Sequence, residues 1–292
     1  MGHPTAERRV TLTQVHDLVI YTRLYLAVGA ALWAYTLALL LGQTIDLVTG
    51  VIVAATVFGL YAVNRLSDLT EDEYNIESAS RRRARGTFVA GVGALFCAVA
   101  VSLWYDPVLL LPVGVIVVLG IAYSVAVIPV GRYRRLKEVP IGKNVTVATG
   151  WTVLLCGMVL VATGAGPSGA LAVLALFVFV HALVGSVIPD VGDVAGDRQA
   201  GIRTIPIQYG LPATKRVLYV ATAVVTVVFY AAIVVGALPR AAVLPGVVNF
   251  LGFPLITALD EENARLLTVL DEVSITYLFC LLTIVSVGVI AG

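Results

Sequence analysis

The chain has 292 residues, of which 59% are hydrophobic and 13% are charged, and its net charge at pH 7 is +1. Soluble domains carry about 25% charged residues, so this composition argues against a soluble globular protein and places most of the surface against something other than water. The near-neutral charge gives no reason to expect a nucleic-acid partner. The three cysteines lie far apart in apolar runs, which argues against a zinc or redox motif.

Nine apolar segments are long enough, or nearly so, to cross a bilayer, which takes about 20 residues. In chain order they cover residues 18–41, 47–66, 87–104, 107–130, 144–164, 169–189, 214–238, 241–259 and 273–292. Apolar residues surround each segment on all sides, which favours spanning helices. No alternating pattern of about 10 residues repeats, which argues against strands. The sequence predicts an all-α integral membrane protein, one domain over residues 1–292, with about nine helices around a central cavity.

The basic residues sort to one side of these segments. If the N-terminus is cytoplasmic, all of the 19 Lys and Arg residues except Arg240 fall in cytoplasmic parts. Because positively charged loops stay inside, we expect a cytoplasmic N-terminus and active-site loops on the cytoplasmic face of the cell membrane. The inner connections are long, and the last of them, 260–272, is predicted to form a short interfacial helix, with a solvated loop as the alternative.

Two rows of oxygen-bearing side chains lie at the inner ends of the second and sixth segments. The rows are Asn64, Asp68 and Asp72, and then Asp190, Asp193 and Asp197. Spacings of three and four residues place each row on one face of a helix. Pro189 is expected to kink or end the sixth helix there and to aim the second row at the cavity. One row alone could be the edge of a solvated loop, but two rows on one membrane face argue against that.

Carboxylates near lipid are costly and usually face a cavity, a metal or a partner. A diphosphate would be repelled by these rows unless cations lay between them. Mg²⁺ takes carboxylate oxygens together with substrate phosphates, and the absence of His and Cys near either row argues against softer metals. The rows therefore predict a divalent-cation site, best suited to Mg²⁺, that holds a phosphorylated substrate.

Basic residues could complete the clamp on a departing phosphate. Arg135, Lys137 and Lys143 precede the fifth segment, and Arg23 lies near the inner end of the first. Arg23 could equally be a side chain that extends from a helix end toward the interface. Since the apolar interior could hold a hydrocarbon tail, the implied substrate is a lipid diphosphate, and the implied step is ionisation of its carbon–oxygen bond. His181 is expected to be a hydrogen-bonded core residue.

These residues resemble a known family. The two rows, with Tyr123-Ser124, Arg135-Leu136-Lys137, Lys143-Asn144, Gly201, Thr204 and Pro206, look like the signatures of the UbiA family of intramembrane prenyltransferases. The resemblance covers most of the chain. It implies that two Mg²⁺ ions hold an isoprenyl diphosphate, that an allylic carbocation forms, and that an acceptor is alkylated.

The resemblance also assigns roles by position. It implies metal binding for Asn64, Asp68, Asp72, Asp190, Asp193 and Asp197, with Asp68, Asp72, Asp193, Asp197 and Tyr123 as the catalytic set, and diphosphate binding for Lys143, Arg135 and Lys137. Arg65 stands where many members have Asp, and no Arg-Pro pair follows the first row. These departures leave the acceptor open between a small aromatic quinone precursor and a lipid.

Two other functions are weighed against this one. A secondary transporter could use carboxylates at helix ends, but it predicts acids near mid-membrane and discontinuous helices. A CDP-alcohol phosphatidyltransferase also has aspartates at a helix end, but it needs Asp-Gly followed by Ala-Arg, which residues 190–197 lack.

Overall fold

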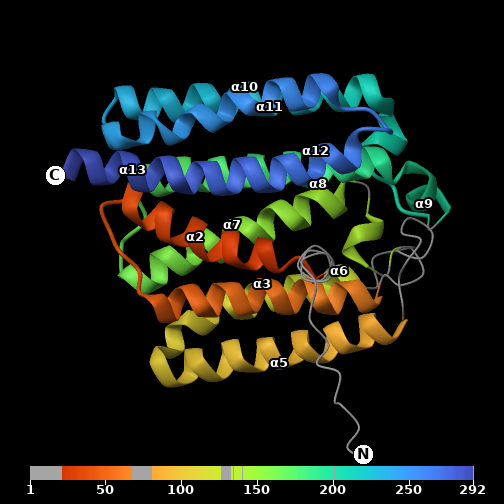
Figure 1. The fold of residues 1–292 in the computed structure, drawn as a ribbon, viewed down its shortest axis with the longest axis horizontal. Helices are drawn as coiled ribbons and strands as arrows, with labels where there is room; N and C mark the ends of the chain where they lie inside the picture. Colours follow the sequence, from red (N-terminus) through yellow and green to blue (C-terminus); the bar gives the residue numbers. More distant parts are fainter. Residues whose placement is uncertain are drawn as a thin grey trace, which may run out of the picture.

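The computed structural model describes residues 22–67, 81–125, 133, 135–139, 141–199 and 201–291. Within these ranges the chain folds into α-helices joined by turns and short 3₁₀ segments (Figure 1). Eight helical stretches of the described residues are long and apolar enough to cross a membrane, and α2 (Leu24–Leu40) is apolar but shorter. The all-α membrane architecture is thus confirmed, while the number of crossings and the orientation stay predictions.

The helices lie side by side along the horizontal direction of Figure 1, with α10 and α11 at one edge and α5 at the other. After α2 come α3 (Leu47–Ser67), α5 (Arg81–Tyr105), α6 (Leu110–Ser124), α7 (Gly142–Thr163), α8 (Gly169–Gly192), α9 (Val194–Gln199), α10 (Ile205–Val234), α11 (Val248–Ala258), α12 (Ala264–Leu270), η5 (Asp271–Leu278) and α13 (Phe279–Ala291). Helix α3 packs against α2 and α5, α7 packs against α6 and α8, and α8 packs against α10.

The crossing of α3 and α5 depends on small side chains. A Cβ atom added to Gly91 would lie 2.3 Å from the Cβ of Ala62, and one added to Gly59 would lie 2.8 Å from the carbonyl oxygen of Gly91. Small residues let helix backbones approach closely where lipid supplies no hydrophobic driving force between helices. These glycines therefore fix how closely the two helices approach.

Capping residues define where helices begin or end on the side of the molecule away from the polar rows. Asp46 accepts a hydrogen bond from the Thr49 amide at 2.7 Å, and Ser168 caps α8 by accepting one from the Leu171 amide at 3.1 Å. Helix α7 stops at Gly164, which takes a left-handed conformation with φ 64°. Such caps satisfy backbone groups that a helix end leaves unpaired. These caps flank two short connections, residues 41–46 and 164–168.

The last helix differs from its predicted boundaries. The sequence placed its start at residue 273, but the chain is helical from Ala264 through α12, the π-helical segment η5 and α13. The predicted short helix in 260–272 exists, yet it continues directly into the final span instead of lying apart. The reason is that its two final acids are accommodated inside the protein, so they do not end the apolar run. Asp271 and Glu272 thereby become part of a helical stretch, Ala264–Val289, that is long and apolar enough to cross a membrane.

Other boundaries shift as well. The predicted loop 190–213 contains α9 and the first turns of α10, where Gly210 takes φ 75° and breaks the helix before Pro212. The predicted loop 67–86 contains the start of α5 at Arg81. The predicted fourth segment, 107–130, ends its helix at Ser124, and residues 126–130 lie outside the described ranges.

Candidate active site

A cavity of about 630 Å³ lies among α2, α3, α5, α6, α7, α8 and η5. The lining residues of α7 and α8 change from polar to apolar along this cavity. On α7 the lining residues run from Lys143 to Leu154 and Leu155, and on α8 they run from Val178 to Asp190. The polar ends of both helices lie together beside α9 (Figure 1). The cavity therefore has a charged end and an apolar length, which suits a molecule with a charged head and a hydrocarbon tail.

All three members of the second predicted row lie at the charged end of the cavity. Asp190, Asp193 and Asp197 all face the cavity, but they do not share one helix as the spacing predicted. Helix α8 continues through Pro189, ends at Gly192 and leaves Asp193 at the joint with φ −102° and ψ 9°, and α9 carries Asp197. Pro189 therefore does not end the helix at once, since α8 continues for three residues beyond it. The break at Asp193 bends the chain while the three carboxylates stay on one wall.

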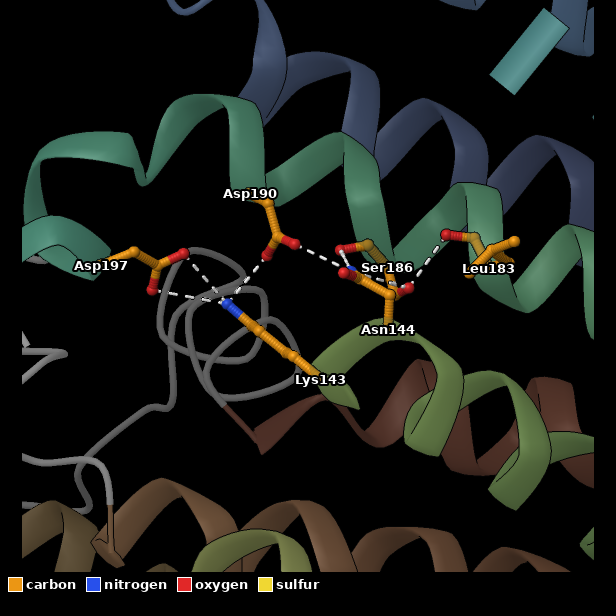
Figure 2. Close-up of polar contacts among 6 residues, drawn as sticks. All are labelled: Lys143, Asn144, Leu183, Ser186, Asp190 and Asp197. Atoms are coloured by element: carbon orange, nitrogen blue, oxygen red, sulfur yellow. Dashed lines mark hydrogen bonds and ion pairs between the residues drawn. The ribbon is translucent and has the colours of Figure 1, made fainter. Parts of the chain in front are cut away.

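Lys143 joins two members of this row (Figure 2). Its Nζ lies 2.8 Å from Asp190 Oδ1 and 3.2 Å from Asp197 Oδ2. The neighbouring Asn144 donates from Nδ2 to Asp190 Oδ2 at 2.8 Å and to Ser186 Oγ at 3.2 Å. Both oxygens of Asp190 are therefore held by the first turn of α7. The motif residues Lys143 and Asn144 thus act as one unit that fixes the position of the acid.

Burial makes the carboxylates of Asp193 and Asp197 expensive to ionise. It raises the pKa of Asp197 to about 6, although Lys143 opposes the shift, and it also raises the pKa of Asp193, again against Lys143. A desolvated carboxylate regains free energy when a cation approaches it. The wall is therefore suited to a positively charged ligand beyond the single ammonium group of Lys143.

The first predicted row is described only in part. Asn64 lies near the end of α3, lines the cavity and accepts a hydrogen bond through Oδ1 from Ser124 Oγ at 2.7 Å. Asp68 and Asp72 lie outside the described residues. Tyr123, directly before Ser124, also lines the cavity. The structure thus brings Asn64 and Tyr123 into the same cavity as the second row.

The predicted basic residues occupy different places. Lys137 lies in the 3₁₀ turn η2 (Leu136–Glu138), lines the cavity and is only 1% exposed. Arg23 lines the cavity too, but it forms an ion pair with Glu272 and lies 5.9 Å from the ring centroid of Tyr61. Arg135 is not among the described cavity-lining residues, and its Nε donates to Glu138 Oε1 at 2.6 Å. Its role in diphosphate binding stays a prediction.

Two acids that the sequence assigned to the last inner connection, outside the spanning segments, also face the cavity. Asp271 and Glu272 line it from η5, and Glu272 accepts hydrogen bonds from Arg23 and Tyr25. The signal that could have found them is the apolar stretch 264–270 directly before them, which extends the last helix backwards. His181 is the hydrogen-bonded residue that the sequence predicted, with Nδ1 2.9 Å from the Phe177 carbonyl oxygen, and it too lines the cavity.

The donors at the charged end suit a hard cation. They are the carboxylates of the second row and the amide oxygen of Asn64, and oxygen ligands of this kind favour Mg²⁺. Among the described residues, no three carboxylate, imidazole or thiol groups are grouped closely enough to hold a metal ion by themselves. The second row therefore fits an ion that draws its other ligands from the first row or from a bound phosphate.

Comparison with known proteins decides the family. The UbiA prenyltransferase family matches residues 15–267, which is most of the chain. The chain belongs to this family. It is 28% identical over 214 residues to the homogentisate phytyltransferase of Synechocystis sp., a match that covers 65% of this chain and 67% of that protein.

Solved UbiA homologues share the fold. A UbiA homologue from Archaeoglobus fulgidus, in a structure bound to DMAPP and Mg²⁺, superposes with a TM-score of 0.65 at 16% identity and covers 94% of this chain and 99% of that one. An apo UbiA homologue from Aeropyrum pernix K1 gives a TM-score of 0.63 at 20% identity, and the superposition covers 91% of this chain and 98% of that one. This UbiA-family member is a prenyltransferase and an integral membrane protein, which decides against the transporter and phosphatidyltransferase alternatives.

Proposed function

We propose that this UbiA-family enzyme transfers an isoprenyl chain from its diphosphate to a small aromatic or lipid acceptor, that it uses Mg²⁺, and that all 292 residues form one catalytic domain. The observation that carries the proposal is a single cavity with oxygen donors and Lys143 at one end and an apolar length beyond them. Homologous structures bound to DMAPP or GPP together with Mg²⁺ support it. We place the charged end at the cytoplasmic face because the basic loops lie on that side.

The two rows are proposed to hold the cofactor. Asn64, Asp68, Asp72, Asp190, Asp193 and Asp197 would bind two Mg²⁺ ions, which would neutralise the diphosphate and stabilise it as a leaving group. Asn144 keeps Asp190 in place by holding one of its oxygens. Lys143, whose ammonium lies between Asp190 and Asp197, would donate to the diphosphate when it binds.

Other basic residues would bind the diphosphate around Lys143. Lys137 faces the cavity from η2, and Arg23 faces it from the start of α2. Arg135 is proposed to act from the turn beside the cavity, next to Glu138. Each positive charge would stabilise the charge that develops as the carbon–oxygen bond breaks.

The apolar part of the cavity would hold the reacting carbon away from water. Leu26, Leu154 and Val178 offer hydrocarbon contacts, and the aromatic rings of Tyr61, Tyr123, Trp33 and Trp151 also line the cavity. Aromatic faces attract cations without reacting with them as water would. We propose that the diphosphate leaves with the bonding electron pair, that these rings stabilise the resulting allylic carbocation, and that the acceptor then attacks the cation and loses a proton.

Purified protein in lipid nanodiscs tests this function. Radiolabelled geranylgeranyl diphosphate is supplied with aromatic and lipid acceptors, with Mg²⁺ or with EDTA. We expect a prenylated product only with Mg²⁺, and almost none from the Asp68→Ala/Asp193→Ala double variant. Turnover in EDTA, or wild-type turnover by that double variant, would overturn the proposal.

A further inference from the structure

Asp271 is the buried acid that the proposed chemistry leaves unexplained. It lies in η5, lines the cavity and is only 8% exposed. Within the described part of the chain, its carboxylate has no hydrogen-bond or ion-pair partner, and the one charged group acting on it is Glu272, which has the same sign. Leaving such a group buried and unpaired is costly. A buried acid that faces a cavity without a partner indicates that a ligand supplies one.

The neighbouring polar groups are already occupied. Glu272 accepts from Arg23 and Tyr25, and His181 uses Nδ1 on the carbonyl oxygen of Phe177. Ser186 donates to the Leu183 carbonyl oxygen and accepts from Asn144. Asp271 therefore differs from these neighbours in lacking a protein partner within the described residues.

The position of Asp271 matches the place of the reacting carbon. A Cβ atom on Gly185 of α8 would lie 2.8 Å from Asp271 Oδ2, so the carboxylate lies directly against that glycine. Gly185 precedes Asp190 by five residues, which is about 7–8 Å along a helix at 1.5 Å per residue. A diphosphate held at Asp190 would put its allylic carbon a few ångströms deeper on the same wall. Asp271 thus lies at the depth where an acceptor must meet that carbon.

The local backbone also marks this site. Residues 271–278 form a π-helix, and π-helical turns are frequent at functional sites. The Thr276 carbonyl oxygen accepts from Trp33 Nε1 at 3.1 Å, which ties the π-helix to α2. This contact fixes the position of the helical segment that carries the Asp271 carboxylate.

We propose that Asp271 is the acceptor-binding residue, that it accepts a hydrogen bond from a hydroxyl group of the acceptor, and that the acceptor is neutral at this position. The inference rests on the proposed function and names its second substrate class. A carboxylate or phosphate on the acceptor would lie against Asp271, whereas the cavity-lining cations Arg23, Lys137 and Lys143 are assigned to the diphosphate by the proposed function. A hydroquinone or an alcohol fits, and its anionic counterpart is rejected.

Two matched acceptor pairs test the charge preference. Methylhydroquinone and homogentisate differ by one carboxylate, and geranylgeranylglycerol and its phosphate differ by one phosphate. Binding is measured by quenching of Trp33 and Trp151, which line the cavity, in the full-length protein loaded with Mg²⁺ and the unreactive donor geranylgeranyl S-thiolodiphosphate. We expect the neutral member of at least one pair to bind at least tenfold more tightly.

Variants connect that preference to Asp271. Asp271→Asn is expected to weaken binding of the neutral acceptor by about ten- to hundredfold, to bring the ratio within the pair close to one, and to leave donor affinity unchanged. Gly185→Ala, which displaces the carboxylate without removing it, should have a similar but smaller effect. Glu261→Gln, an exposed acid on the same connection, and Gly114→Ala, where a Cβ meets open space, are the matched controls.

The outcomes separate the two proposals. If no neutral acceptor binds more tightly than its anionic counterpart, or if Asp271→Asn retains the wild-type preference, the acceptor inference is overturned. Donor binding that is independent of Mg²⁺ would instead count against the proposed function. If the donor needs Mg²⁺ to bind and the acceptor preference is the same in Asp271→Asn as in wild type, only the acceptor inference is rejected and the proposed function stands.

Discussion

The two charged walls of the cavity treat their acids differently. On the α7–α8 wall, Lys143 and Asn144 hold Asp190 through both oxygens, and Lys143 also reaches Asp197. On the α2–η5 wall, Arg23 and Tyr25 hold Glu272, while Asp271 beside it has no partner among the described residues. Acids with partners have positions that the protein itself fixes. The buried acid without one, Asp271, shows where the protein relies on a ligand.

The largest effect is expected from removing an acid of the α7–α8 wall. Asp193→Asn should lower kcat by at least about a thousandfold, because loss of a charged group that stabilises the transition state costs several kcal/mol. Product formation under saturating donor measures it. Asp260→Asn, in the connection before α12, is the control, and activity above a tenth of wild type in Asp193→Asn would show that this wall is not the catalytic one.

Replacing Lys143 tests whether the α7–α8 wall needs its internal cation. Lys143→Met leaves Asp190 and Asp197 buried without that cation, so we expect about a hundredfold loss of kcat together with a lower melting temperature. Thermal unfolding and donor kinetics in detergent report the two effects separately. Lys215→Met, which removes an amine that donates to the exposed Thr257 carbonyl, should change neither. Full activity in Lys143→Met would remove this residue from the mechanism.

Asn144 offers a smaller, purely positional test. Asn144→Ala frees one oxygen of Asp190 without changing any charge. Since residues that orient metal ligands typically change metal affinity 10- to 100-fold, we expect the Mg²⁺ concentration for half-maximal activity to rise by about tenfold. A Mg²⁺ titration of activity measures this, with Asn263→Ala in an exposed turn as the control. An unchanged Mg²⁺ requirement would mean that Asp190 does not need this support.

The sequence predicted the α7–α8 wall far better than the α2–η5 wall, for physical reasons. Helical spacing within Asp190–Asp197 survives the break at Asp193, since both pieces keep their side chains on the cavity wall. The sequence places Asp271 and Glu272 outside the last span, in a connection with a short interfacial helix, because hydropathy falls at two adjacent acids. Arg23 and Tyr25, which come from the other end of the chain, accommodate Glu272 in the last helix. A single sequence does not reveal such a distant pairing, and hydrophobic periodicity does not indicate a π-helix.

The smallest effect is expected at the ion pair of the α2–η5 wall. Arg23→Gln should lower stability by about 1 kcal/mol, because the Arg23 side chain is 35% exposed and water screens the pair. If Arg23 also binds diphosphate, the same variant raises the KM for the donor severalfold, whereas Glu272→Gln does not. Equal donor KM values in the two variants would limit Arg23 to a structural role.

The central claim is that both rows hold one Mg²⁺–diphosphate unit, and calorimetric titration of geranyl diphosphate into the purified protein tests it most directly. Wild type, Asp72→Asn, Asp193→Asn and the double variant are compared with and without Mg²⁺. We predict tight binding only by wild type with Mg²⁺, a large loss in each single variant, and little further loss in the double variant, because residues that act as one unit are not additive. Binding that ignores Mg²⁺, or that survives the loss of either row, would contradict the account.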